Sequence, residues 1–117
     1  MRKDLEQRLV KFSISVIDMC DSLGKSFLAE HLSKQILRSS SSAALNYGEA
    51  QGSISNKEFV HKLGLVEKEL RESYINLKII SGSKIKVDKL LIDKLQKEND
   101  ELIAIIFSCV KTAKKKL

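Results

Sequence analysis

Residues 38–59, RSSSSAALNYGEAQGSISNKEF, decide the fold of this chain. They begin as a run of small residues with helical spacing, break at Gly52 and restart at Ser55. Ser55 and Glu58 match a capping box: the serine hydroxyl accepts from the glutamate amide, which is worth about 1 kcal/mol, and the glutamate reaches back. Small side chains also let a neighbouring helix approach closely. The stretch therefore predicts two closely packed helices joined by a tight exit and restart.

Apolar residues recur at steps of three and four along the whole chain, which predicts amphipathic helices with stops at Gly24 and around residues 81–83 and an N-cap at Asp88. Helices with short connections predict an all-α protein, an antiparallel up-down-up-down four-helix bundle of one domain over residues 1–117. The expected helices span about residues 4–23, 26–48, 56–80 and 88–114. Their expected core stripes are Leu5, Leu9, Phe12, Val16, Cys20 and Leu23; Leu28, Leu32, Ile36, Ser39, Ala43 and Tyr47; Phe59, Leu63, Val66, Leu70, Tyr74 and Leu77; and Leu91, Leu95, Asn99, Leu102, Ile106, Cys109 and Ala113.

The composition agrees with this fold. The 117 residues include no proline and only five glycines. These residue types cost a helix interior about 3 and about 1 kcal/mol respectively. Aromatic residues make up 5% of the chain and tryptophan is absent, so we expect an aliphatic core.

Three irregularities in the pattern carry further expectations. The first helix has a second apolar line, Val10, Ile14 and Ile17, well around the cylinder from the core stripe, and this line predicts self-association. Gly64, inside the third helix, should cost about 1 kcal/mol, so we expect close packing against a neighbour there. Asn99 is a polar member of a core stripe, which either fixes helix register or lies at a wet end of the bundle.

Positive charge is concentrated in the C-terminal tail. The chain carries 21 Lys and Arg against 15 Asp and Glu, a net charge of +6; without four tail lysines the balance is 21 − 4 = 17 against 15, or +2. A basic tail favours polyanions through counterion release, and cations equally suit the C-terminal dipole of a helix. RNA or DNA would be contacted at phosphates with little sequence specificity, because few aromatics are present to stack on bases. The candidate contacts are Lys111, Lys114, Lys115 and Lys116, and Lys84, Lys86 and Lys89 could extend the patch.

The sequence contains few patterns that would indicate a metal-binding or catalytic site. Glu58 and His61 have Glu-x-x-His spacing, but the second copy that a di-metal bundle needs is missing, so we expect no metal and no cofactor. The serines at 39–42 have no neighbouring histidine, and Gly48 and Gly52 form no phosphate-binding motif. We therefore expect a protein that is not an enzyme.

The compartment is inferred from what the pattern lacks. Cys20 and Cys109 stand alone in apolar helical patterns, which predicts buried free thiols in a reducing environment. The first residues contain no signal-peptide core, and no apolar run approaches the roughly 20 residues that cross a bilayer. We expect a cytoplasmic protein without a membrane partner.

From residue 38 onward the chain resembles a known bacterial family of small four-helix bundle proteins, first noticed as products of intervening sequences in large-subunit rRNA genes. Its pattern is loosely an arginine, small residues, Asn-x-x-Glu, Ser-x-x-Glu-Phe and a Glu-Leu-x-Glu-like run. Ala50 stands where most members have glycine, so the exit of the second helix is expected to differ slightly. The matching residues are Arg38, Ser40 to Ala44, Asn46, Glu49, Ser55, Glu58, Phe59, Glu69 and Glu72.

This resemblance implies a homopentamer around a central channel. It also implies a likeness to the accessory proteins of diversity-generating retroelements, which bind a reverse transcriptase and nucleic acid. For the motif residues we expect structural roles. Arg38 and Glu49 lie too far apart along their helix to need to meet, Asn46 satisfies backbone groups at the helix exit, and Glu69 pairs with a neighbouring subunit.

Our leading hypothesis is a non-enzymatic, self-associating bundle that acts as an interaction scaffold, with RNA or DNA as a further partner. The alternative is a protein-directed adaptor, such as an accessory protein of a polymerase or reverse transcriptase. An enzyme or cofactor carrier with a site inside the bundle, near Glu58 and His61, ranks third.

Overall fold

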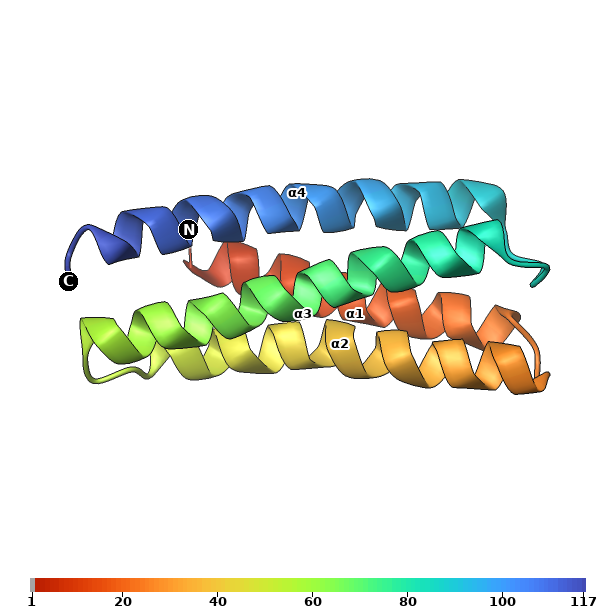
Figure 1. Ribbon diagram of the computed structural model, residues 1–117, viewed down its shortest axis with the longest axis horizontal. Coiled ribbons are helices and arrows are strands. Elements are labelled where there is room, and N and C mark those ends of the chain that lie inside the picture. Colours follow the sequence, from red (N-terminus) through yellow and green to blue (C-terminus); the bar gives the residue numbers. More distant parts are fainter. Residues whose placement is uncertain (1) are drawn as a thin grey trace.

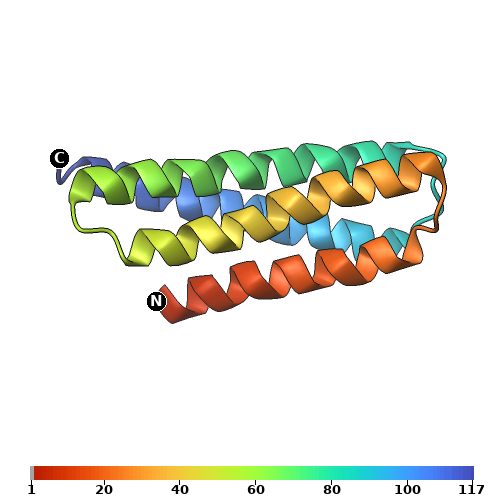
Figure 2. The same cartoon turned by 90° about the horizontal axis from the view of Figure 1, so that it is seen from below.

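The computed structural model describes the backbone of residues 2–117 and the side chains of residues 4–117. The chain forms α1 (Arg2–Ser22), α2 (Phe27–Gln51), α3 (Asn56–Gly82) and α4 (Lys89–Lys114). Consecutive helices run antiparallel, and the two views show them lying side by side (Figures 1 and 2). α1 packs on α2 and α4, and α3 packs on the same two helices. The predicted all-α four-helix bundle is therefore confirmed.

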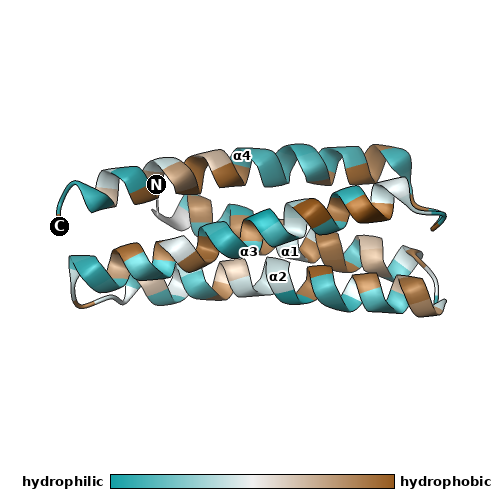
Figure 3. Ribbon diagram, viewed as in Figure 1, coloured by the Kyte–Doolittle hydropathy of each residue, from teal (hydrophilic) through white to brown (hydrophobic). Residues whose placement is uncertain are grey.

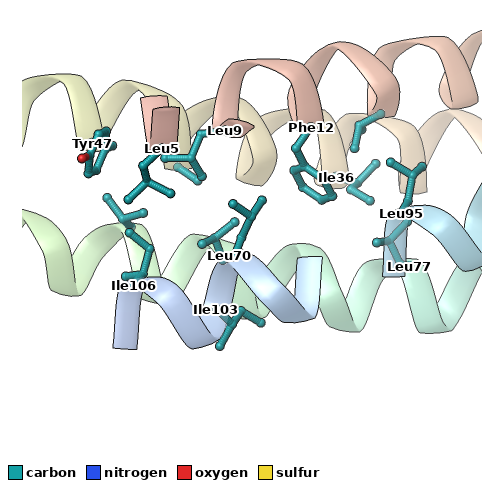
Figure 4. Close-up of a cluster of buried hydrophobic side chains, with 14 of the residues drawn as sticks. Leu5, Leu9, Phe12, Ile36, Tyr47, Leu70, Leu77, Leu95, Ile103 and Ile106 are labelled. Carbon is teal, nitrogen blue, oxygen red and sulfur yellow. The ribbon is translucent and has the colours of Figure 1, made fainter. Parts of the chain in front are cut away.

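Each helix buries one stripe and exposes the other face, so hydrophilic and hydrophobic segments alternate along the ribbons (Figure 3). Buried side chains from the four helices meet between them, and they are mostly aliphatic, as expected (Figure 4). The stripes are those predicted except at their ends. In α2, Leu28 is 44% exposed and Ala29 is buried instead. In α4, Ile92 and Val110 are buried, whereas the predicted Leu91 and Cys109 are only half-buried, like Phe59, Tyr74 and Cys20.

Most of these errors share one cause; Cys109 is the exception, since the buried residue there, Val110, follows Ile106 at a step of four. A step of four residues advances about 40° beyond a full turn, because an α-helix turns roughly 100° per residue. A chain of such steps, Leu28 to Leu32 to Ile36, therefore drifts off the core face, and the true stripe must include a step of three. Ala29, at three residues from Leu32, lies on the buried face for that reason.

The turns use the residues that the sequence indicates. Gly24 has φ +87°, a left-handed conformation that glycine adopts without a Cβ penalty. Ser55 Oγ accepts from Glu58 N at 3.1 Å, but the Glu58 carboxylate reaches back to Ile54 N at 3.2 Å, one residue earlier than the standard box. Asp88 caps α4 as predicted. α2 continues three residues beyond its predicted end, because Gly48 stays helical and Gly52 forms the C-cap.

Two buried polar contacts join α3 to its neighbours. Ser39 Oγ on α2 and Ser73 Oγ on α3 are 2.7 Å apart with both side chains fully buried. Asn99 Nδ2 donates to Leu70 O at 2.9 Å, also in the interior. The suggestion that Asn99 lies at a wet end is therefore wrong: it is a core residue, and its contact sets the register of α4 against α3.

Candidate interaction surfaces

The Arg38 motif joins α2 to α3. The Arg38 guanidinium donates to Glu69 Oε2 at 3.0 Å and to Glu72, and these hydrogen bonds raise the pKa of Arg38 above its ordinary value. Glu69 is mostly buried, whereas Arg38 is half-exposed. The expectation that Glu69 pairs with a neighbouring subunit is wrong, because its partner lies in the same chain. Such partly exposed pairs contribute at most about 1 kcal/mol, so the motif aligns the helices more than it stabilises them.

The other motif residues are also structural. Asn46 Nδ2 donates to Ser42 O at 2.9 Å within α2, so Asn46 supports its own helix and not the exit. Glu49 does not meet Arg38; its carboxylate accepts from Lys62 Nζ at 2.6 Å and ties the end of α2 to α3. Arg38 and Glu49 thus link α2 to α3, whereas Asn46 bonds within α2.

A second ion-pair cluster went unnoticed in the sequence. Arg8 donates to Glu98 at 2.6 and 3.0 Å and to Glu101 at 3.3 Å, which joins α1 to α4. The hydrogen bonds that Arg8 donates to the Glu98 carboxylate are the main reason that the pKa of Arg8 is raised. The only signal in the sequence was an arginine beside a core stripe, and that signal names no partner.

The second apolar line of α1 is exposed. Val10, Ile14 and Ile17 are 44%, 52% and 46% accessible, and they lie on the side of α1 away from the core stripe. A Cβ placed at Gly64, on the exposed face of α3, would meet no atom within 4 Å. The close neighbour expected at Gly64 is therefore absent from the described part of this chain.

The tail lysines, at positions 111, 114, 115 and 116, are all exposed. Asn56 Nδ2 donates to Lys116 O at 3.3 Å, which holds the tail beside the start of α3. The connection between α3 and α4, which carries Lys84 and Lys86 and leads into Lys89, lies at the opposite end of the bundle (Figure 1). Lys89 forms an ion pair with Asp93. The two groups are separated by the length of α4, roughly 39 Å, so the joint patch suggested by the sequence does not form within one chain.

The titratable residues that the structure describes form no metal-binding cluster. His31 and His61 are exposed, and no group of three or more His, Cys, Asp or Glu side chains among the described residues could hold a metal ion. Both cysteines are free, and burial raises the pKa of both the Cys20 and the Cys109 thiols, which keeps them protonated and weakly nucleophilic. None of the described helices has an apolar stretch that could cross a membrane.

The architecture is that of a small all-α four-helix bundle with an aliphatic core. The chain belongs to the 23S rRNA-intervening sequence protein family, whose model matches residues 3–108. Its fold is also that of a crystal structure described as a protein with unknown function from the S23 ribosomal protein family of Bacteroides thetaiotaomicron VPI-5482. The TM-score is 0.82 at 22% identity, over 95% of this chain and 99% of that one. Neither finding indicates an enzymatic family, and no curated protein matches the chain.

Proposed function

We propose that this protein is a non-enzymatic, self-associating four-helix bundle that serves as an interaction scaffold and binds RNA or DNA weakly through its tail. The observation that carries the proposal is the exposed line Val10, Ile14 and Ile17 on α1. Fully burying one such side chain is worth about 1.5–3 kcal/mol, and each of these is already half-covered by its own helix. A contact that buries the line between copies would therefore stabilise an assembly.

The position of Gly64 supports an assembly of the head-to-tail kind. α1 and α3 occupy opposite corners of the bundle, since each packs on α2 and α4. A copy that offers α1 and a copy that offers the exposed backbone at Gly64 would use different surfaces, and such heterologous contacts form a ring when the rotation between copies closes. The family resemblance implies a pentameric ring. In a ring, the tail lysines of all copies act together, and weak phosphate contacts gain avidity.

The test is sedimentation at micromolar concentration of the wild-type protein and of Ile14→Glu. We expect an oligomer for the wild type and a helical monomer for Ile14→Glu, because the new carboxylate would be desolvated in the contact. Leu90→Glu is the matched control, since Leu90 is 75% exposed at the first turn of α4, on a different helix from the α1 line. A wild-type monomer, or an Ile14→Glu protein that still assembles, would remove the basis of the proposal.

A protein-directed adaptor is the second candidate, and it is favoured by a groove at the tail end of the bundle, which is lined by the start of α1, the end of α2, the α2–α3 turn and the end of α4. Co-purification of a defined protein partner from the native host separates this candidate from a scaffold that binds only itself and nucleic acid.

A further inference from the structure

The bundle has a step at the end where the tail lies. Arg8 on α1 meets Glu98 on α4, and α1 begins six residues before Arg8, so the start of α1 lies level with about residue 104 of the antiparallel α4. α4 continues to Lys114, roughly 15 Å further. Both views show the end of α4 extending past the start of α1 (Figures 1 and 2).

The flank of α4 that meets α1 continues along this overhang, beyond the described start of α1. Glu98 and Glu101 are followed at steps of three and four by Ile105, Cys109 and Thr112, and such steps keep residues on one side of a helix. All three residues line a groove that the start of α1, the end of α2 and the α2–α3 turn close on the other sides. The groove therefore lies where a helix coaxial with α1 would pack.

The lining is apolar with specific polar groups. Phe59 and Ile105 are half-buried in it, and Ile54 in the turn is 94% exposed at its edge. The buried atoms Gln51 Oε1 and Ser53 Oγ have no hydrogen-bond partner in the part of the chain that the structure describes. Leaving such groups unpaired costs about 1–3 kcal/mol each, so a turn of these two side chains toward an occupant with hydrogen-bond donors would be favoured.

Charge selects the kind of occupant. Lys116 lies in the wall of the groove and the exposed Lys114 and Lys115 adjoin it, whereas Asp4 is the single acid among the described lining residues. A segment with acidic residues beside its apolar face would therefore be attracted, and a basic one repelled.

We propose that this groove, the end groove, binds an acidic amphipathic helix of a partner protein, which packs coaxially with α1 against the overhanging turns of α4. The proposal deepens the scaffold function by assigning it a class of protein partner, and it rests on that function only for the idea that the bundle recruits other molecules. It uses none of the residues of the α1 line.

The test uses three fluorescein-labelled probes with the full-length protein. The first is a synthetic helix of about four turns with leucines on one face and glutamate and alanine on the other. The second replaces the glutamates with lysines, and the third is a single-stranded oligonucleotide. We expect the acidic helix to bind at least tenfold more tightly than the basic helix. The proposal would be overturned if the acidic and basic helices bound equally, or if the oligonucleotide bound and neither helix did.

Two variants locate the binding. Thr112 is exposed in the groove, so Thr112→Trp fills it without disturbing the core, and we expect at least a tenfold loss of affinity. Ala104→Trp is the control on the same helix, since Ala104 is exposed and outside the lining; we expect less than a twofold change. Equal losses in the two variants, or no loss in either, would count against the end groove.

The two cysteines supply an internal control. Cys109 lines the groove and Cys20 lies between α1 and α2, and both thiols are half-buried and free. Bound acidic helix should slow alkylation of Cys109 several-fold and leave Cys20 unchanged, as read by mass spectrometry. Protection of both, or of neither, contradicts the assigned site. Sedimentation of the same samples separates the self-association proposal from the end-groove proposal. A protein that sediments as a monomer but still binds the acidic helix would remove the self-association proposal alone.

Discussion

At the scale of single residues, the most revealing side chain is Asn99, because it is polar, fully buried and only half-satisfied. Its amide nitrogen donates to Leu70 O, but Oδ1 has no partner among the described residues. Leu70 O belongs to a helix and keeps its own backbone partner, so removing the amide leaves little unpaired. We expect Asn99→Leu, of similar shape, to raise the free energy of unfolding by about 1 kcal/mol, since an unsatisfied buried acceptor disappears.

Urea unfolding of Asn99→Leu measures this change. The same variant should relax the register of α4 against α3, which broadens the amide spectrum even as stability rises. Ser73→Ala serves as a comparison, because it removes a buried polar group that does have a partner in Ser39. We expect Ser73→Ala to lose stability, and any loss of stability in Asn99→Leu would contradict our account of Asn99.

Gly64 gives a second prediction at the scale of single residues. Its Cβ position is open, so Gly64→Ala should stabilise the isolated chain by about 0.5–1 kcal/mol through helix propensity. If Gly64 contacts another copy, the same variant should weaken assembly. Urea unfolding of Gly64→Ala in the Ile14→Glu background, which we expect to be monomeric, measures the change in the free energy of unfolding. Sedimentation of Gly64→Ala in the wild-type background measures the change in assembly. A variant that is stabilised and assembles normally would place Gly64 outside the contact between copies.

At the scale of elements, the helices and their caps follow from local rules, whereas the contacts between helices do not. Period and capping predicted four helices, with Gly24, Ser55 and Asp88 at their ends, because those signals lie within a few neighbouring residues. The partner of Glu69 was mispredicted because an ion pair between α2 and α3 depends on the relative rotation of two helices. The end groove could not be predicted at all, since it arises from the offset between α1 and α4.

The restart of α3 gives a prediction at this scale. Ser55→Ala removes the oxygen that accepts from Glu58 N, so we expect a loss of about 1 kcal/mol in urea unfolding. Ser41→Ala is the matched control, because Ser41 is exposed in the middle of α2 and its hydroxyl only bonds back to its own helix. That control should be neutral or slightly stabilising. Equal effects of the two substitutions would mean that the box contributes nothing to the restart.

At the scale of the whole molecule, charge is divided between two ends separated by the length of α4. This division makes a discriminating experiment possible, because equal numbers of lysines can be removed from either end. Changing Lys111, Lys114, Lys115 and Lys116 to alanine lowers the formal net charge from +6 to 6 − 4 = +2. Changing Lys25, Lys84, Lys86 and Lys89 lowers it equally at the other end.

If the tail contacts phosphates, its removal should reduce the steepness of log K against log salt for a single-stranded oligonucleotide. Each lost phosphate contact removes about 0.7 from that slope, so a tail in full contact would account for up to roughly 3 per chain. The variant at the opposite end should weaken binding slightly through net charge while it leaves the slope in place. Fluorescence anisotropy across a salt series measures both. Equal reductions in slope would mean that nucleic acid senses only the total charge, and the tail would then be simply the favourable end of a helix dipole.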